Sequence, residues 1–467
     1  MFFQGVKYIK NRLSKKQSLD DGPWKLLNLI PVVLPISLAV FGVVAMLFLV
    51  GNNFDGALIW PLGLMAASIP AYVIYRIHPD IKLDKEAKFT LLTVLAGVIL
   101  WILFNIALSS QHVHTNRDPA IYGVSSLRLA DERNLQTPSA KVLNGTTGVI
   151  ETSGGYAHSK IDSDYIHAQG AHMLPALLGA FGKITDDSLM LRLNPIFGGI
   201  ALLAVFAFAR MIMRPRWALV ATVALSVAMP MIYFSRDTYT EPLMAAFVFG
   251  MLALIALADK TNRAGFWLLA GITAGAIALV RIDAPMAIMG VLVGALVYLL
   301  IAKKGFRILA MRNFILLLIP LALICLLSIY DVSQLSSVYF NSQKSKIIGQ
   351  YLVIGGVLTT GLLAVFIAWK TRLLGWLDRH SIDWRGKVAI FAVFGGAIFL
   401  ATRPIWMISH RHSPIQTTES LQRATGLTLD AFRDYGEQTI NWMIWYIGPV
   451  LVVFAVIGFA IAAYKAM

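Results

Sequence analysis

The sequence contains little cysteine and few charged residues. Its single cysteine, Cys325, lies in an apolar run, which excludes an intrachain disulfide, a cysteine-rich zinc site and an iron–sulfur cluster. Charged residues make up only 14% of the 467 residues, where a soluble domain carries about 25%. Hydrophobic residues make up 57%, and the mean hydropathy is +0.69. These values exclude a water-soluble globular protein and point to a chain embedded in a membrane.

Long apolar runs account for most of the sequence. A helix needs about 20 mostly apolar residues to cross the hydrocarbon core of a bilayer. Twelve stretches meet or nearly meet this requirement: 29–50, 57–75, 89–109, 191–209, 217–234, 242–258, 265–280, 286–302, 314–330, 347–369, 388–401 and 442–464. None of them alternates between apolar and polar residues as a strand of a membrane barrel does. Their backbone N–H and C=O groups must therefore form hydrogen bonds within helices. The sequence predicts an all-α, polytopic membrane protein with about twelve transmembrane helices.

The basic residues are concentrated on one side of the expected membrane. The chain holds 40 Lys and Arg against 25 Asp and Glu, a net charge of +15. With the N-terminus in the cytoplasm, the inner segments carry a net charge of +17 and the outer segments −2. Cytoplasmic loops are rich in Lys and Arg, so we expect a multi-pass cell-membrane protein with both termini in the cytoplasm. The basicity reflects this orientation and indicates no nucleic-acid partner.

Two outer loops, 110–190 and 402–441, are long and rich in ionisable groups, whereas most inner loops are short. Elaborated loops on one face suggest that chemistry takes place on that face. The short inner segments leave no room for a nucleotide-binding domain, and no GxxxxGK[ST] motif occurs. An ATP-driven pump is therefore not expected.

Asp118 follows the third span by about ten residues, so it should lie close to the outer membrane surface. Its carboxylate could accept a proton from a hydroxyl group or coordinate a cation. Asp before Pro119 is also typical of a helix start, which makes capping the alternative role. His112 and His114 would bind a divalent cation with Asp118 if the backbone between them is extended. No other cofactor is expected.

An apolar run at 173–182 is too short to cross the membrane. We expect an amphipathic helix lying in the membrane interface. His167 and His172 stand near its start and are candidates for substrate binding, with simple solvation as the alternative.

The next outer turn places Arg236, Asp237 and Glu241 within six residues. Asp237 and Glu241 are four residues apart, so on a helical turn their carboxylates share one face. Both are candidates for catalysis. Glu241 stands before Pro242, so it could instead cap the following span.

Arg281 lies at the outer end of the seventh span, where the orientation rule disfavours a basic residue. Ionisable residues near a membrane face usually have a partner or a function. A guanidinium group at headgroup depth can hold a lipid phosphate through two hydrogen bonds. The alternative is a structural ion pair of Arg281 with Asp283 or Asp237.

The order of several short elements resembles a known superfamily. Arg192-Leu193 with Gly198 opens one span, a basic turn follows at Arg210–Arg216, then Phe234-Ser235-Arg236-Asp237 and the stretch ALVRIDAPM at 278–286. Over about residues 89–300 these elements resemble the GT-C superfamily of membrane glycosyltransferases. The similarity is closest to the branch of protein O-mannosyltransferases and lipid A aminoarabinose transferases.

The resemblance implies inverting transfer of a sugar from a polyprenyl-phosphate donor to a hydroxyl of a lipid, glycan or protein on the outer face. Asp118 matches the first-loop acid that acts as base or binds the acceptor. Asp237 or Glu241 matches the acid of the second outer loop, and Arg281 matches the cation near the donor phosphate. Arg117 and Arg236 are further candidates for the phosphate, and Tyr122 and Asp283 for substrate binding.

The resemblance also divides the chain into four parts. These are a basic cytoplasmic N-terminus (1–28), two additional spans (29–88), a GT-C-like catalytic module (89–302) and C-terminal spans (303–467).

Two other functions fit a chain of about twelve spans. A secondary transporter or lipid flippase places charges and helix breaks at mid-membrane depth, often with repeats in its two halves. Here the candidate charges cluster at one face, and no convincing half-to-half repeat is found. A non-catalytic subunit of an envelope complex is the second alternative; in it, Asp118, Asp237, Glu241 and Arg281 would be individually replaceable.

Overall fold

The computed structural model describes a large part of the chain. The described residues are 22–78, 83–113, 118–135, 137–138, 156–158, 165–302, 304–371, 384–406, 424, 426 and 448–466. The chain divides into two compact units, and the larger one covers Gln17–Lys370. All of the candidate residues that the structure describes lie in this larger unit. Of the expected residues, His114, Arg117 and most of the loop 402–441 lie outside the described part.

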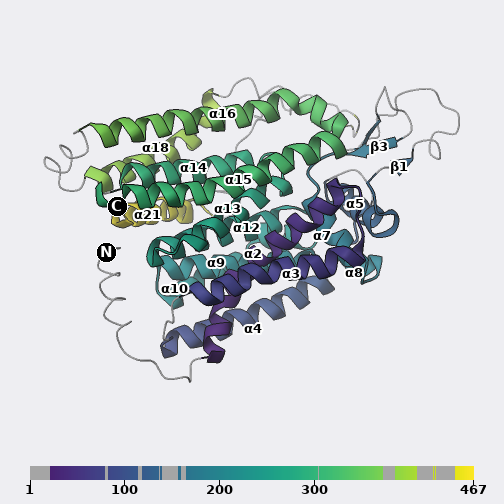
Figure 1. Cartoon of the computed structure of the whole chain (residues 1–467). Helices are drawn as coiled ribbons and strands as arrows, with labels where there is room; N and C mark the ends of the chain where they lie inside the picture. Colours follow the sequence, from purple (N-terminus) through teal and green to yellow (C-terminus); the bar gives the residue numbers. More distant parts are fainter. Residues whose placement is uncertain are drawn as a thin grey trace. The chain divides into compact units, whose positions relative to one another are not determined.

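Helices build almost all of the described structure (Figure 1). In the larger unit they are α2 (Gly22–Val50), α3 (Gly56–Ile77), α4 (Lys85–Ala107), α5 (Asp118–Glu132), α7 (Met173–Gly182), α8 (Asp187–Leu191), α9 (Asn194–Ile212), α10 (Pro215–Ser226), α11 (Met229–Ser235), α12 (Glu241–Thr261), α13 (Ala264–Val280), α14 (Pro285–Leu300), α15 (Arg307–Leu335) and α16 (Ser337–Lys370). The smaller unit contains α18 (Trp384–Trp406) and α21 (Pro449–Ala466).

Three short strands interrupt the helical pattern in the first long loop. They are β1 (Thr137–Pro138), β2 (Tyr156–His158) and β3 (Tyr165–Ala168), and they form an antiparallel sheet in the order β1-β3-β2. Ile166 of β3 pairs with Thr137 on one side and His158 on the other. The expected all-α class is confirmed for the membrane part, with this small sheet as an addition outside it.

The prediction of a polytopic membrane protein is confirmed. Among the described residues, seven helices are long and apolar enough to span a membrane, or eight if the bent pair α10 and α11 forms one span. This pair falls on the expected span 217–234 and is bent by 61°. Four other expected spans fall on shorter apolar helices, namely α13, α14, and parts of α18 and α21. The exact count of twelve is therefore not confirmed.

Several helices begin where short polar side chains or prolines allow it. The carboxylates of Asp55, Asp84 and Asp186 each accept a hydrogen bond from a free backbone N–H in the first turn of α3, α4 and α8. Proline occupies the first turn of α9, α10, α11, α12 and α14, where its missing N–H costs nothing. These signals place the turns between helices at defined residues.

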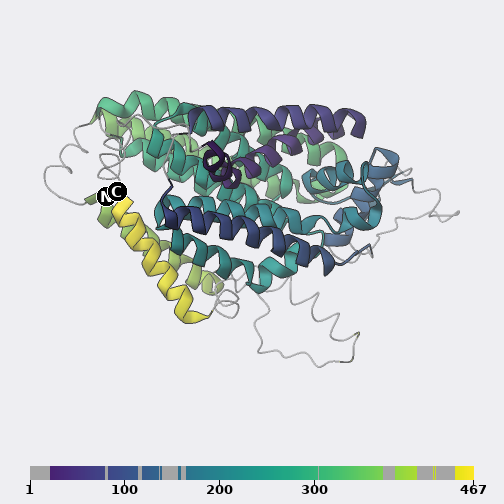
Figure 2. The same cartoon turned by 90° about the horizontal axis from the view of Figure 1, so that it is seen from below.

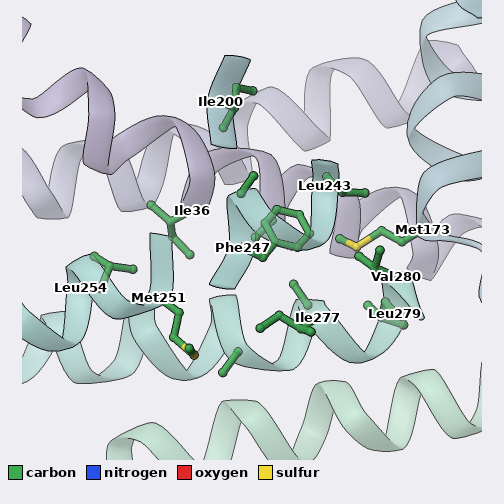
Figure 3. Packing of buried hydrophobic residues seen from close by; sticks show 14 of the residues in the cluster. Ile36, Met173, Ile200, Leu243, Phe247, Met251, Leu254, Ile277, Leu279 and Val280 are labelled. Carbon is green, nitrogen blue, oxygen red and sulfur yellow. The ribbon is translucent and has the colours of Figure 1, made fainter. Parts of the chain in front are cut away.

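The core of the larger unit lies between α2, α9, α12 and α13. Figure 3 shows part of it, with Phe247 of α12, Ile277 of α13 and Met173 of α7 in one buried cluster. Helices α13 and α15 pack side by side and run in the same direction. Gly275 packs on Ile324, and further along both helices the Ser328 hydroxyl donates to the Ala278 carbonyl at 2.6 Å. The small residues of α13 let the two backbones come close together.

Helix α7 lies within this packing. The expected helix at 173–182 is present, and all of its residues from Met173 to Ala180 are buried. Its apolar character therefore reflects burial against protein, chiefly α5 and α2, rather than one face turned to lipid. At its far end, the Trp60 indole of α3 donates to the Ala180 carbonyl at 2.8 Å.

Candidate functional site

The segments expected on the outer side of the membrane meet at one end of the larger unit. Helices α5, α7 and α8 and the labelled strands lie at the right-hand end of Figure 1, and the view turned by 90° places them at the same end (Figure 2). Hydrogen bonds and ion pairs join these segments through the pairs Ser110–Arg236, Arg133–Asp55, Arg281–Glu241 and His172–Asp331. The spans therefore place the candidate residues of distant loops together.

Arg281 stands at the centre of an ion-pair cluster. Helix α13 ends at Val280, and the extended backbone of Arg281 turns its side chain toward the start of α12. Its Nη1 donates to Glu241 Oε1 at 2.6 Å and to Thr240 Oγ1 at 3.1 Å. Its Nε and Nη2 donate to Asp283 Oδ1 and Oδ2 at 2.8 and 3.2 Å. We call Thr240, Glu241, Arg281 and Asp283 the Arg281 cluster.

Most of the N–H donors of Arg281 have partners within this cluster. A guanidinium group has five N–H donors, and four of those on Arg281 are used within the cluster. The expected structural pair is therefore present with Asp283. The Asp283 side chain is 52% exposed, against 36% for Glu241, the other carboxylate on Arg281. Asp283 is consequently the partner that solvent or a ligand can most easily replace.

Helix α5 brings Asp118 and Tyr122 to the same place. Asp118 is the exposed first residue of α5, directly before Pro119, as the sequence predicts for a helix start. Tyr122 lies one turn later, next to Gly170, whose φ of +104° strongly favours glycine. A Cβ on Gly170 would lie only 3.3 Å from the Tyr122 hydroxyl.

The electrostatics of Tyr122 tie it to the Arg281 cluster. Burial raises the pKa of the Tyr122 hydroxyl, and the negative charges of Asp118 and Glu241 raise it further, while Arg281 opposes them. Tyr122 therefore remains a neutral hydrogen-bond donor at physiological pH. Asp118, Tyr122 and the Arg281 cluster form one polar group built from α5, α12 and the turn after α13.

Asp237 and Arg236 belong to a neighbouring arrangement. Asp237 Oδ2 lies 3.2 Å from His112 Nδ1, and its Oδ1 accepts the Thr238 N–H at 2.8 Å. Arg236 donates from Nε to Asn105 Oδ1 at 2.7 Å, which holds it against the end of α4. The sequence-predicted pair of carboxylates is thus split, with Glu241 on Arg281 and Asp237 on His112.

The expected metal ligands are not assembled as a set. Within the described ranges, no group of three or more His, Cys, Asp or Glu side chains is placed to hold a metal ion. His112 faces Asp237, and His114 lies outside the described residues. A divalent cation held by His112, His114 and Asp118 stays a prediction.

His172 is buried and has partners that the sequence did not indicate. Only 1% of the His172 side chain is exposed, and its Nδ1 lies 2.8 Å from Asp331 Oδ1 of α15. Asp331 also accepts the backbone N–H of His172 at 3.3 Å. On the other side of the ring, Nε2 lies 3.2 Å from the Ser336 hydroxyl. His172 therefore holds the loop against α15, and its role in substrate binding stays a prediction.

Ser336 completes this buried network. It sits at the break between α15 and α16, and its hydroxyl lies 2.6 Å from the Ala168 carbonyl and 3.1 Å from that of Gly170. The network thereby fixes Gly170, against which Tyr122 packs. His167 lies in β3, and its side chain is outside the described part. Its role in substrate binding stays a prediction.

Asp331→Ala should destabilise the folded protein by about 3 kcal/mol, because it leaves two buried donors of His172 without an acceptor. The measurement is the midpoint of thermal unfolding of the purified chain in detergent. Combining Asp331→Ala with His172→Ala should cost less than the sum of the two single changes, since both remove the same contact. Strictly additive costs would contradict this coupling.

Asn194 is a second residue whose role the sequence did not indicate. It is fully buried at the start of α9, and its Nδ2 lies within hydrogen-bond distance of the carbonyls of Phe234 (2.9 Å) and Tyr239 (3.0 Å). The Thr238 hydroxyl in the same turn donates to the Pro119 carbonyl of α5. Together these bonds fix the turn that carries Asp237 and leads into Glu241.

Comparison with known proteins gives one match. Residues 171–330 match the family model described as dolichyl-phosphate-mannose-protein mannosyltransferase, and this segment contains His172 and the whole Arg281 cluster. Neither the curated proteins nor the solved structures gave a match. The expected resemblance to GT-C glycosyltransferases is confirmed over this segment, which is about a third of the chain.

Proposed function

We propose that this chain is a GT-C-type membrane glycosyltransferase and that it moves a sugar from a polyprenyl-phosphate donor to a hydroxyl of a lipid, glycan or protein acceptor. We further propose that transfer takes place on the extracytoplasmic face and inverts the anomeric carbon. The observation that carries the proposal is the polar group formed by Asp118, Tyr122 and the Arg281 cluster at one end of the spans. It combines an exposed carboxylate with a positioned guanidinium group.

In the proposed reaction Asp118 is the general base. Its carboxylate takes the proton of the acceptor hydroxyl as that oxygen bonds to the anomeric carbon. The bond from this carbon to the phosphate oxygen breaks in the same step, and polyprenyl phosphate leaves with the electron pair. The exposure of Asp118 supports this role, because an acceptor must reach it. Single displacement without a covalent enzyme intermediate gives inversion.

Arg281 is proposed to stabilise the departing phosphate. Like the Asp283 carboxylate that now occupies Nε and Nη2, a phosphate is anionic and can offer two oxygens to a guanidinium group. The donor phosphate would replace Asp283, while Glu241 and Thr240 continue to hold Nη1. Glu241 is therefore assigned to orienting Arg281, and Asp237 with His112 to shaping the neighbouring turn.

Asp283→Ala should lower the KM for the donor by about fivefold, because a half-exposed ion pair worth about 1 kcal/mol no longer competes with the phosphate. The KM for the acceptor should change little. The test is steady-state kinetics with each substrate varied in turn. An increased donor KM would contradict the replacement of Asp283 by phosphate.

The proposed sidedness rests on the distribution of charge. The end of the larger unit opposite to the Arg281 cluster carries Arg210, Arg214, Arg263 and Arg307 at the starts or ends of helices. Basic residues at helix ends mark the cytoplasmic side. The Arg281 cluster would then face the extracytoplasmic side, and both termini the cytoplasm.

The proposal is tested with the purified full-length chain and a panel of donors that share one polyprenyl phosphate and carry mannose, glucose, galactose or aminoarabinose. At least one donor should be consumed with release of polyprenyl phosphate, whereas nucleotide-linked forms of the same sugars should not react. Consumption of nucleotide sugars alone would contradict the lipid-linked donor.

A further inference from the structure

A cavity of about 640 Å³ lies at the far end of the larger unit from the Arg281 cluster. It is formed by the start of α15 and the end of α16, and its lining includes Arg307, Ile308, Arg312, Ile315 and Trp369. Arg307 and Asp331 are 24 residues apart on α15, which rises about 1.5 Å per residue, so about 36 Å separate the Arg307 wall of this cavity from Asp331 and the site near it. The cavity is thus independent of the proposed donor site.

Arg307 is held in place within the cavity wall. Its Nη1 donates to the Trp369 carbonyl at 2.8 Å, and its guanidinium group lies 5.3 Å from the centre of the Trp369 ring. Its Nε is buried and makes no hydrogen bond within the described part of the chain. Trp369 is itself fixed, because its indole donates to the Leu299 carbonyl at 3.1 Å. A guanidinium group held in position in the wall of a cavity is suited to bind an anion.

The charge around this cavity is of one sign. Arg312 lies one helical turn after Ile308 and is exposed, and Lys370 is exposed at the end of α16, next to Trp369. The lining formed by the described residues contains two arginines and no acidic side chain. The two arginines of this lining favour an anionic group over a neutral one.

The rest of the lining is apolar and faces outward. Ile308 is 89% exposed and Ile315 is 44% exposed, and with Met311 they follow one face of α15 at helical spacing. Such a stripe beside the arginines matches a molecule with an anionic head and an apolar tail. Tryptophan and arginine at a helix end are typical of the headgroup region of a membrane.

We propose that this cavity binds an anionic phospholipid from the membrane leaflet that lies at the Arg307 end of the helices. Its phosphate is held by Arg307 and Arg312, and one acyl chain lies along Ile308, Met311 and Ile315. Basic pockets between membrane helices on the cytoplasmic side bind anionic headgroups in this way. The bound lipid joins the start of α15 to the end of α16.

The test uses the full-length chain in mild detergent with added dioleoyl phosphatidylglycerol or dioleoyl phosphatidylcholine. Phosphatidylglycerol should raise the midpoint of thermal unfolding more than phosphatidylcholine does, and native mass spectrometry should detect it bound. Arg312→Gln should weaken the apparent affinity for phosphatidylglycerol by about fivefold. Arg307→Gln should weaken it at least as much, and Arg312→Gln alone decides the outcome if Arg307→Gln does not fold.

Two control variants distinguish lipid binding in this cavity from nonspecific attraction of an anionic lipid to basic residues. Arg263→Gln removes an exposed arginine from the same end of the unit, at the start of α13, and should leave the response unchanged. Arg214→Gln removes another exposed arginine from this end, at the start of α10, and should also leave it unchanged. Equal responses to the two lipids, or equal losses in Arg263→Gln and Arg312→Gln, would overturn the proposal.

Discussion

Asp118→Asn is expected to lower sugar transfer by about 10²–10⁴-fold while the protein still folds. The loss is that of a general base, since an amide cannot take up the proton of the acceptor hydroxyl. Folding should be preserved because Asp118 is exposed and Asn is as good as Asp at a helix start. The substitution therefore separates the proposed catalytic role from the capping role that the sequence also allows.

The measurement is the initial rate of transfer by the purified variant, with the midpoint of thermal unfolding as the check on folding. Asp131→Asn is the matched control, because Asp131 is an exposed acid near the other end of the same helix. This control should keep the full rate. Full activity in Asp118→Asn would remove Asp118 from the reaction and leave it a capping residue.

Arg281→Lys is expected to reduce kcat/KM for the donor by about 10²–10³-fold. Lysine keeps the positive charge but cannot hold a phosphate through two parallel hydrogen bonds. It also loses the contacts that Nη1 makes with Glu241 and Thr240, so the charge is no longer aimed at the departing phosphate. The loss should appear in the donor kinetics and hardly in the KM for the acceptor.

Arg133→Lys is the matched control for this experiment. Arg133 lies at the same end of the unit and pairs with Asp55 at 2.9 Å, but its side chain is 61% exposed and outside the Arg281 cluster. It should keep nearly the full donor kcat/KM. A change confined to the acceptor KM in Arg281→Lys would reject the phosphate role.

The sequence predicts the membrane class and the ion pair of Arg281 with Asp283 well, because both follow from local signals. Apolar run length indicates the spans, and Asp118-Pro119 and Glu241-Pro242 mark the starts of α5 and α12. The position of Arg281 on the disfavoured side signals a partner, and the structure provides Asp283 two residues away together with Glu241. Short sequence separations and composition are sufficient for these inferences.

The sequence cannot predict contacts that the packing of distant spans creates. His172 and Asp331 are 159 residues apart, so nothing local shows that they meet. An acidic residue inside the mostly apolar segment 307–335 is nevertheless a signal, because such a group in a membrane helix needs a partner. Asn194 gives no such signal, since its carbonyl partners belong to a turn about 40 residues later.

The exact span count stays unconfirmed for a related reason. The run 217–234 is continuous in hydropathy, but Pro230 stands in the first turn of α11, and the chain bends by 61° between α10 and α11. Proline starts a new helix there because it cannot donate the hydrogen bond that would continue α10. Hydropathy alone does not register this break.

The most direct test of the proposed mechanism is the anomeric configuration of the product formed by the full-length chain from a polyprenyl-phosphate sugar. Nuclear magnetic resonance of the purified glycoside gives this configuration relative to that of the donor. We predict inversion, together with loss of the product when Asp118 is replaced by Asn. Retention would require a covalent intermediate on an enzyme carboxylate, and would contradict a single displacement assisted by Asp118 and Arg281.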